Sequence, residues 1–260
     1  MSYETLQCDV VGEVATITLN RPDKRNAIST RMISDLLAAF DEVERGSARV
    51  AIITGAGKAF CAGMDLDGLR SLTARSPQEN LEDSRRTAKL FHRIYSFPKP
   101  LISAVNGAAI AGGCGIATLV DFTLAVPEAK FGYTEVRIGF IPALVSVFLR
   151  RQAGEKVARD LLLSGRLIDA QEAFRLGLVT EIVASDKLLE RARELAGTLL
   201  ASSPTSILRT KRLLLASGEA ALQAEIELAI RENAEIRSTH DFREGLASFL
   251  EKRAPKWTGR

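Results

Sequence analysis

Residues 101–120 combine an absence of charge with glycines whose spacing could bring backbone close to a ligand. The stretch reads LISAVNGAAIAGGCGIATLV and holds Gly107, Gly112, Gly113 and Gly115 among small alanines. Glycine permits close backbone approach, so a buried strand, a tight loop and a buried helix here could form a binding site. A run of about twenty apolar residues is also enough to cross a bilayer.

The residue types favour the globular alternative over the membrane span. Asn106 adds a polar group, and each glycine would weaken a lone helix by roughly 1 kcal/mol. No basic cluster flanks the stretch, as is usual beside a membrane span. The pattern predicts a strand over 101–105, a loop over 106–113 and a buried helix from Cys114.

Other common catalytic signatures are missing from the sequence. His92 and His240 lie in no metal-ligand pattern, and each is more often structural than a ligand. No glycine run ends in Gly-Lys-Ser or Gly-Lys-Thr, no GxGxxG unit follows a strand, and no serine lies in a GxSxG elbow. The sequence therefore argues against nucleotide hydrolysis, NAD chemistry and serine hydrolysis, and it predicts no metal site.

The elements around this stretch predict an α/β core followed by a helical tail. Ser29 is a candidate N-cap for an amphipathic helix. Further helices are expected over 143–153 and 155–163, and helical periodicity dominates after Asp186. The predicted strands cover residues 3–9, 14–19, 50–54, 101–105, 123–125, 130–131 and 178–183. We expect a core with the active site over residues 1–200 and a helical assembly region over residues 201–260.

Composition restricts the broad class of the protein. With 260 residues, 46% of them hydrophobic, the chain is long enough to bury a large core. Lys and Arg exceed Asp and Glu by only three, which does not favour a nucleic-acid partner. The three cysteines, an odd number, suggest buried thiols in a reducing compartment. Without a visible signal peptide, the expected location is cytoplasmic, and no membrane association is expected.

Several spaced segments, in order along nearly the whole chain, resemble the crotonase (enoyl-CoA hydratase/isomerase) superfamily. The segments are LNRPDKRNAIS at 19–29, KAFCAGMDL at 58–66, AVNGAAIAGGCGIATLVDF at 104–122, AKFGYTEVRIGFIP at 129–142, DLLLSGRLIDAQEAFRLGLV at 160–179 and EGLASFLEKRAPKW at 244–257. The resemblance implies a spiral of ββα units, a C-terminal helical region that packs a homotrimer or homohexamer, and an acyl-CoA substrate. Coenzyme A belongs to that substrate, so no separate cofactor is expected.

The resemblance also implies roles for three catalytic positions. The backbone N–H groups of Met64 and Gly112 would form an oxyanion hole for a thioester enolate, and Gly113 would let the thioester approach closely. Glu135 would be the acid or base, in an apolar pocket that raises its pKa. Taken without the family, Glu135 is more often a surface residue beside Arg137.

A larger set of positions is expected to bind the substrate. Phe249 and Lys252 would reach the coenzyme A of a neighbouring subunit, although core packing and surface charge are their ordinary explanations. The expected substrate-binding residues are Lys24, Arg25, Met64, Asp65, Leu66, Asp67, Gly112, Gly113, Phe249 and Lys252.

Two departures from the family pattern bear on the reaction. Many hydratases of the family carry a second glutamate where this chain has Gly115, and ALVSVFLRR at 143–151 replaces a glycine-rich segment. A single glutamate suits the transfer of a proton between carbons, whereas hydration is easier with two carboxylates. Hydration would remain possible if Asp65 or Asp67 reached the site, or if Glu135 both activated water and handled the α-proton.

The leading hypothesis is an enoyl-CoA hydratase of fatty acid metabolism that adds water reversibly to a 2-enoyl-CoA. The first alternative is a Δ3,Δ2-enoyl-CoA isomerase that uses the single glutamate. The second is a protein of the same fold that binds coenzyme A or RNA with little catalysis, for which a concentrated basic face is expected.

Overall fold

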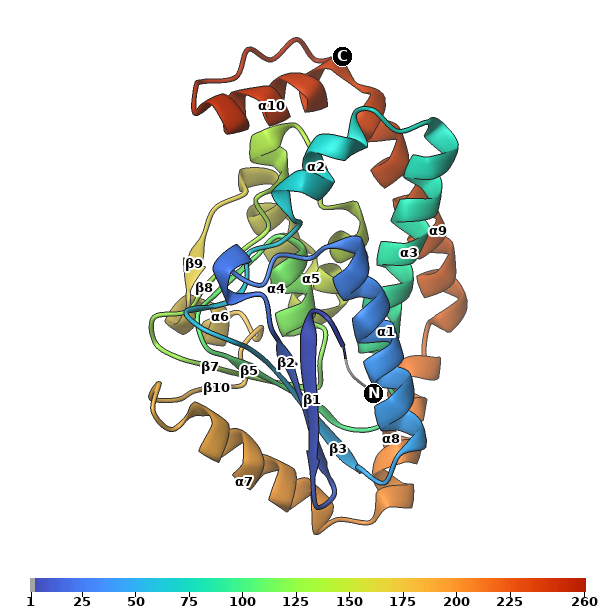
Figure 1. Cartoon of the computed structure of the whole chain (residues 1–260). Helices are drawn as coiled ribbons and strands as arrows, with labels where there is room; N and C mark the ends of the chain where they lie inside the picture. The colour runs from blue at the N-terminus through green and yellow to red at the C-terminus, as the bar shows by residue number, and fades with distance from the viewer. Residues whose placement is uncertain (1–2) are drawn as a thin grey trace.

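The chain passes repeatedly from one β-sheet to a second and back, as the computed structural model shows for residues 3–260, the part it describes (Figure 1). In each pass, one strand joins the first sheet and the next strand joins the second. The three passes are β3 (Val50–Gly55) with β4 (Ala59–Cys61), β5 (Leu101–Val105) with β6 (Ala108–Ile110), and β7 (Phe122–Ala125) with β8 (Lys130–Gly132). This is the expected α/β spiral of ββα units.

The two sheets are mostly parallel. The remaining strands are β1 (Leu6–Val11), β2 (Val14–Leu19), β9 (Ile168–Asp169) and β10 (Glu181–Ile182). The first sheet has the order β1-β2-β3-β5-β7-β10 and the second β4-β6-β8-β9. Among residues 3–260 the antiparallel pairs are β1–β2 and β8–β9, and the other pairs are parallel. Successive parallel strands end at the same edge of their sheet, so the loops that follow β3, β5 and β7 lie near one another.

Helices surround and connect the sheets. The α-helices are α1 (Thr30–Arg45), α2 (Leu66–Leu72), α3 (Pro77–Tyr95), α4 (Gly112–Thr118), α5 (Ala143–Ser164), α6 (Ala170–Arg175), α7 (Leu188–Leu200), α8 (Pro204–Ala216), α9 (Glu219–Glu235) and α10 (His240–Glu251), and the 3₁₀ turns are η1 (Pro22–Lys24), η2 (Glu135–Ile138) and η3 (Ile236–Ser238). Ser29 caps α1 as expected, accepting a hydrogen bond from the Met32 amide. Gly154, at φ 81°, interrupts α5 between the two helices expected there.

The prediction for residues 106–113 was wrong in two respects. The segment is not all loop, because Ala108–Ile110 forms β6 and pairs with both β4 and β8. The following helix begins at Gly112, two residues before the expected start at Cys114. Small alanines concealed the strand, because a three-residue strand has no periodicity to detect.

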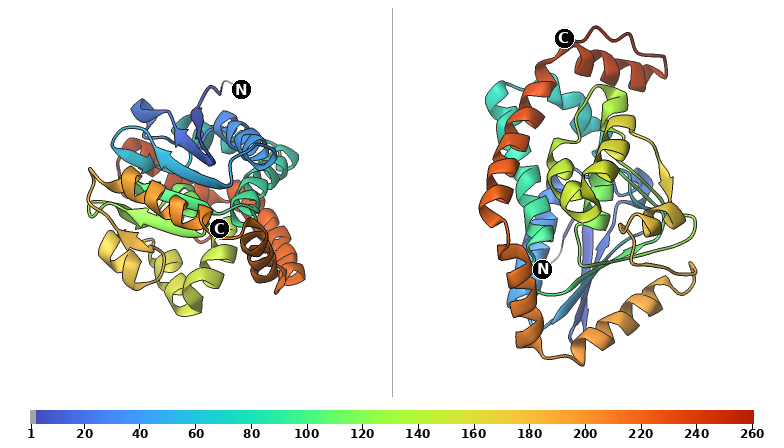
Figure 2. Two further views of the ribbon diagram at one scale, coloured as in Figure 1. Left: turned by 90° about the horizontal axis from the view of Figure 1, so that it is seen from below. Right: turned by 180° about the vertical axis from the view of Figure 1, so that it is seen from behind.

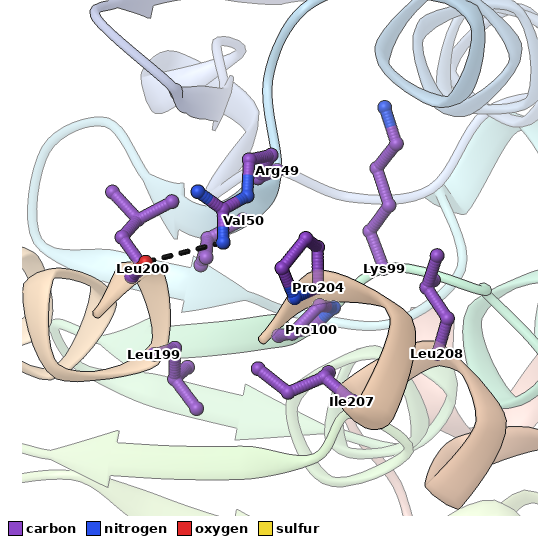
Figure 3. Close-up of a pocket in the computed structure, with 9 residues that line it drawn as sticks. All are labelled: Arg49, Val50, Lys99, Pro100, Leu199, Leu200, Pro204, Ile207 and Leu208. Carbon is purple, nitrogen blue, oxygen red and sulfur yellow. Dashed lines mark hydrogen bonds between the residues drawn. The ribbon is translucent and has the colours of Figure 1, made fainter. Parts of the chain in front are cut away.

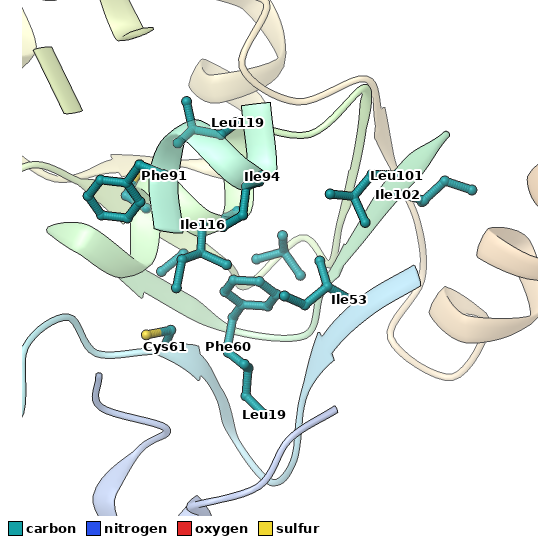
Figure 4. Packing of buried hydrophobic residues seen from close by; sticks show 14 of the residues in the cluster. Leu19, Ile53, Phe60, Cys61, Phe91, Ile94, Leu101, Ile102, Ile116 and Leu119 are labelled. Atoms are coloured by element: carbon teal, nitrogen blue, oxygen red, sulfur yellow. The ribbon is translucent and has the colours of Figure 1, made fainter. Parts of the chain in front are cut away.

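The main core lies between the two sheets and around α4. Phe60 of β4, Ile53 of β3 and Ile116 of α4 are fully buried and lie in one cluster (Figure 4). Helix α4 contacts strands of both sheets. The charge-free stretch of the sequence is therefore central to the core, and no helix within residues 3–260 has the length and apolar character that a bilayer crossing needs.

The C-terminal helices return to the core. Helix α9 packs along α3 and α5, and Figure 2 shows it beside α3 from behind. Leu222, Ile226 and Ile230 of α9 are buried members of the main core cluster. Residues 201–260 thus share their packing with residues 1–200, while the expected role of this region in assembly stays a prediction.

A small cavity of about 60 Å³ lies where α7 and α8 meet the start of β3 (Figure 3). The guanidinium of Arg49 donates hydrogen bonds to the carbonyl oxygens of Leu200 and Ser202, each at 3.1 Å. The cavity lining is mainly apolar and contains no carboxylate. These features indicate a structural contact that fixes the end of α7 and not a ligand site.

Gly113 is the point at which α4 packs against β4. A Cβ atom added to Gly113 would lie 2.3 Å from the carbonyl oxygen of Cys61 and 2.8 Å from its Cβ. A backbone oxygen cannot move away without displacing the strand. Only glycine therefore fits this position in the observed arrangement.

We predict that Gly113→Ala lowers the free energy of unfolding by about 2–3 kcal/mol, because the new methyl group overpacks α4 against β4. The matched control is Gly197→Ala in α7, where an added Cβ would contact nothing within 4 Å. That variant is expected to gain about 0.5–1 kcal/mol from the better helix former. Urea unfolding followed by circular dichroism measures both, and equal stabilities would contradict the packing account.

Candidate active site

A cleft of about 1080 Å³ opens between the loop after β4, α4, η2 and the C-terminal helix α10. Its size suits a large ligand. The expected site residues that line it are Lys24, Arg25, Met64, Asp65, Leu66, Asp67, Gly112, Glu135 and Phe249. Gly113 and Lys252 are not among the lining residues. The structure thus brings together in one cleft the three positions expected to be catalytic.

The backbone around Met64 is held firmly against the loop that precedes α4. Gly63 has φ 86°, and a Cβ added there would lie 2.9 Å from the carbonyl oxygen of Ile110. On either side of Met64, the Ile28 amide donates to Gly63 O at 2.7 Å and the Asp65 amide donates to Ile28 O at 2.9 Å. Within residues 3–260 the Met64 amide itself donates to no other group, so it is available to a ligand.

The backbone before Gly112 is strained. Ala111 has φ 51° and ψ −126°, a conformation that a residue with a Cβ atom rarely adopts. Its amide donates to Gly132 O at 2.7 Å, and its carbonyl oxygen accepts from the Cys114 amide at 2.9 Å. Such strain costs about 1–3 kcal/mol and persists where neighbouring contacts enforce it. In the described chain the Gly112 amide, like that of Met64, has no acceptor.

Glu135 begins the η2 turn and directs a carboxylate oxygen into buried surroundings. Its Oε2 atom is buried and has no hydrogen-bond partner within residues 3–260. Ile138, Phe140 and Ile141 line the same cleft. Because burial disfavours the charged form, it raises the pKa of Glu135 to about 7. A carboxyl group with this pKa can take up and release a proton near neutral pH.

Close backbone packing against α10 fixes the η2 turn. Gly139 ends the turn at φ 66°, and a Cβ atom there would lie 2.3 Å from the Asp241 carbonyl oxygen. A Cβ atom on Gly245 would lie 2.3 Å from Ile138 O. Helix α10 therefore holds the turn that carries Glu135, and its Phe249 lines the cleft of the same chain. Lys252 ends α10 at φ 55°.

The position of the missing second glutamate and the altered segment after Pro142 pack against each other. A Cβ atom added to Gly115 would lie 2.8 Å from Cγ1 of Val145 and 3.5 Å from the ring of Phe91. Val145 belongs to the ALVSVFLRR segment. Its side chain occupies the space that a side chain at position 115 would need, so the two departures are complementary.

The two aspartates that follow Met64 differ in whether their carboxylates are free to react. Asp65 pairs with Arg21 at 2.8 Å and accepts a hydrogen bond from the Asp67 amide. Burial alone would raise the pKa of Asp65, but Arg21 and the amide hold it below its usual value. Asp65 is thus a structural anion that caps α2. Asp67 is largely exposed, 3.4 Å from Arg70.

One group of cleft residues was not expected from the sequence. Arg75, Asp83, Asn233 and Arg237 line the cleft together with Thr87. Arg237 is 2% exposed and lies over the ring of Phe140. The spacing of Asp83, Thr87 and Phe91 on one face of α3 was a usable signal. Nothing local links Arg237 to them, because it follows them by about 150 residues.

We predict that Glu135→Gln changes how stability depends on pH. The folded protein binds this proton more tightly than the unfolded chain, where the glutamate pKa is near 4.5. The free energy of unfolding of the wild type should therefore fall as pH rises from about 4.5 to about 7, by up to about 3 kcal/mol. The variant lacks this loss, so its stability relative to the wild type should increase between pH 5 and pH 8.

Chemical unfolding at each pH measures this difference. The control is Glu128→Gln, which changes an exposed glutamate and should keep the pH dependence of the wild type. Parallel curves for wild type and Glu135→Gln would show that Glu135 titrates normally.

Sequence comparisons identify the family of this chain. The family model described as Enoyl-CoA hydratase/isomerase matches residues 10–260. A Thermus thermophilus protein provisionally named an enoyl-CoA hydratase is 47% identical, over 95% of this chain and 98% of its own length. The 2,3-dehydroadipyl-CoA hydratase of Escherichia coli is 36% identical, over 95% and 96%.

A solved structure shows the same fold. The crystal structure of an enoyl-CoA hydratase/isomerase from Xanthobacter autotrophicus Py2 matches with a TM-score of 0.88 and 30% identity, covering 97% of this chain and 98% of that one. Fold, site geometry and full-length relatives therefore agree: the chain belongs to the enoyl-CoA hydratase/isomerase (crotonase) superfamily of enzymes.

Proposed function

We propose that the protein catalyses the reversible addition of water to a 2-enoyl-CoA. The observation that carries the proposal is the buried Oε2 atom of Glu135, which has no hydrogen-bond partner in the described chain. It lies in the same cleft as the backbone N–H groups of Met64 and Gly112, which donate to no other group within residues 3–260. One group can move a proton while the other two hold a developing negative charge. Relatives named as hydratases over nearly the full chain support this choice.

In the first step, the Glu135 carboxylate takes a proton from water. The water oxygen bonds to C3 of the substrate, and the electrons of the double bond shift onto the thioester oxygen. The amides of Met64 and Gly112 donate to that enolate oxygen. Donors already fixed in place need no reorganisation, and losing one in an acyl-transfer enzyme costs about 10²–10³ in rate.

In the second step, Glu135 returns its proton to C2, and the enolate collapses to the hydrated thioester. The atoms balance, because the hydroxyl group is on C3, the proton is on C2 and the carboxylate is regenerated. A pKa of about 7 lets one group act as base and then as acid. This scheme needs no second carboxylate, which fits the packing of Val145 against Gly115.

In this proposal the coenzyme A part of the substrate lies at the solvent-exposed margin of the cleft. Lys24 and Arg25 are exposed there and can contact its phosphates, and the backbone of residues 64–67, which also lines the cleft, would pass beside the thioester. Assembly into a homotrimer or homohexamer is part of the proposal. Exposed leucines on the C-terminal helices, Leu213 at 70% and Leu228 at 52%, support it.

A second candidate reaction is the isomerisation of a 3-enoyl-CoA to a 2-enoyl-CoA. It is favoured by the absence of a second free acid, since Val145 fills the space beside Gly115 and Asp65 is paired with Arg21. Glu135 would take a proton from C2 and return it to C4, while the same two amides hold the enolate.

We predict that the purified protein consumes a 2-enoyl-CoA and does not isomerise a 3-enoyl-CoA. The conjugated enoyl absorbance should fall with the first substrate and should not appear with the second. Isomerisation without hydration would instead establish the second candidate. Binding of coenzyme A thioesters without either reaction would establish a non-catalytic role.

We predict that Glu135→Gln lowers kcat for hydration at least about 10²-fold, because the amide cannot exchange a proton. KM should change little, since the neutral amide keeps the shape of the side chain. Glu128→Gln is the matched control and should retain the wild-type rate. A Glu135→Gln variant with wild-type kcat would remove Glu135 from the mechanism.

A further inference from the structure

A buried polar cluster lines the cleft beyond the catalytic groups, and the proposed reaction does not use it. We define the cluster by Arg75, Asp83, Asn233 and Arg237. Asp83 pairs with both arginines, through Oδ1 with Arg75 and through Oδ2 with Arg237, each at 2.9 Å. Asn233 Oδ1 accepts from Arg237 at 2.7 Å and from Ser84 at 2.8 Å. The cluster joins α9 and η3 to α3.

The cluster has hydrogen-bond donors left over but no free carboxylate oxygen. Both oxygens of Asp83 and the amide oxygen of Asn233 are already engaged. Arg75 uses only Nη1, so its Nη2 and Nε have no partner within residues 3–260. The same holds in the described chain for Nδ2 of Asn233, a residue that is 6% exposed and lines the cleft. A ligand group here must accept hydrogen bonds.

The charges of the cluster are also unbalanced. Two guanidinium groups share the single carboxylate of Asp83. Burial lowers the pKa of Arg237, Asp83 opposes that change, and the nearby positive charge of Arg75 adds to it. Glu79, the other acid near Arg75, is exposed and engaged by Ser76. An anion beside Arg75 would therefore relieve the repulsion between the two arginines.

Helix α3 sets the distance between this cluster and the oxyanion glycine. Asp83, Thr87 and Phe91 all line the cleft, and they repeat every fourth residue along one face. The ring of Phe91 would lie 3.4 Å from a Cβ atom on Gly112. Eight residues separate Asp83 from Phe91, which corresponds to about 12 Å along the helix.

We propose that this cluster selects an acyl chain that ends in a carboxylate, with Arg75 as the residue that binds it. The inference rests on the proposed function, because it assumes that the thioester lies at Met64 and Gly112. A chain that leaves the thioester along α3 passes Thr87 and brings its far end to Arg75. The guanidinium of Arg75 then offers Nη2 and Nε as a fork, and Asn233 adds its Nδ2 donor.

A purely structural role accounts for only part of the cluster. Arg237 is fully enclosed and uses all three of its nitrogens to hold α3, η3 and α9 together. Arg75 lies in the loop between α2 and α3, and its side chain is 25% exposed. In the described part of the chain, one polar contact, the ion pair with Asp83, holds that side chain. A structural role therefore explains why Arg237 is present, but it does not explain the free hydrogen-bond donors of Arg75.

Binding of saturated acyl-CoA thioesters tests the proposal without requiring catalysis. Isothermal titration calorimetry compares ten- and twelve-carbon chains, each ending in a methyl group or in a carboxylate, because extended chains of these lengths span the distance of about 12 Å along α3. The wild type should bind the carboxylate form of at least one length tenfold or more tightly than its methyl counterpart. Arg75→Gln should reduce that preference at least tenfold, and Arg75→Lys should restore part of it. Arg86→Gln, an exposed position of α3 outside the cleft, is the control and should keep the wild-type preference.

The results distinguish a failure of the carboxylate site from a failure of the proposed reaction. A carboxylate form that binds less than tenfold more tightly than the methyl form at both lengths, or a preference that Arg75→Gln leaves unchanged, would overturn the carboxylate site. If 2-enoyl-CoA is not hydrated while the carboxylate preference holds and depends on Arg75, the proposed reaction fails and the binding site stands. Thermal melting of each variant shows whether a loss of preference reflects unfolding.

Discussion

The chemistry proposed for this cleft depends on burying one carboxylate oxygen of Glu135 without giving it a partner. An unpaired buried acid is unfavourable in its charged form, so the pKa rises to about 7. The fold must hold this arrangement against the tendency of the carboxylate to reach water. It does so through the η2 turn, whose backbone contacts α10 at Gly139 and Gly245 with no room for a side chain.

Close backbone packing also positions Met64 and Gly112, the proposed oxyanion donors. Gly113 lets α4 pack directly against the backbone of Cys61 in β4. Gly63 likewise lets the loop that carries Met64 pack against the backbone of Ile110. Between them, the strained backbone of Ala111 is held by hydrogen bonds to Gly132 and Cys114. Two amides from loops about fifty residues apart in sequence are thus presented to one cleft with no side chain of their own involved.

The sequence predicted the strands and helices whose periodicity is long enough to read, such as Leu101–Val105 and the helix capped by Ser29. It missed β6, which has three residues and only small side chains. Glu135, Met64 and Gly112 were identified through the family motifs, and the structure places them in one cleft. Arg75 and Arg237 could not be paired beforehand, because only the packing of α9 on α3 brings them together. The exclusion of a side chain at Gly115 likewise depends on Val145, thirty residues away in another helix.

The central claim, a buried Oε2 atom of Glu135 without a hydrogen-bond partner, can be tested most directly by observing the titration of that carboxyl group. Carbon-13 NMR of protein labelled at the glutamate side-chain carboxyl, with Glu135→Gln used to assign the resonance, reports its protonation at each pH. The account predicts a carboxyl resonance that titrates near pH 7 and is missing from the variant. A Glu135 resonance that titrates near 4.5 would contradict it.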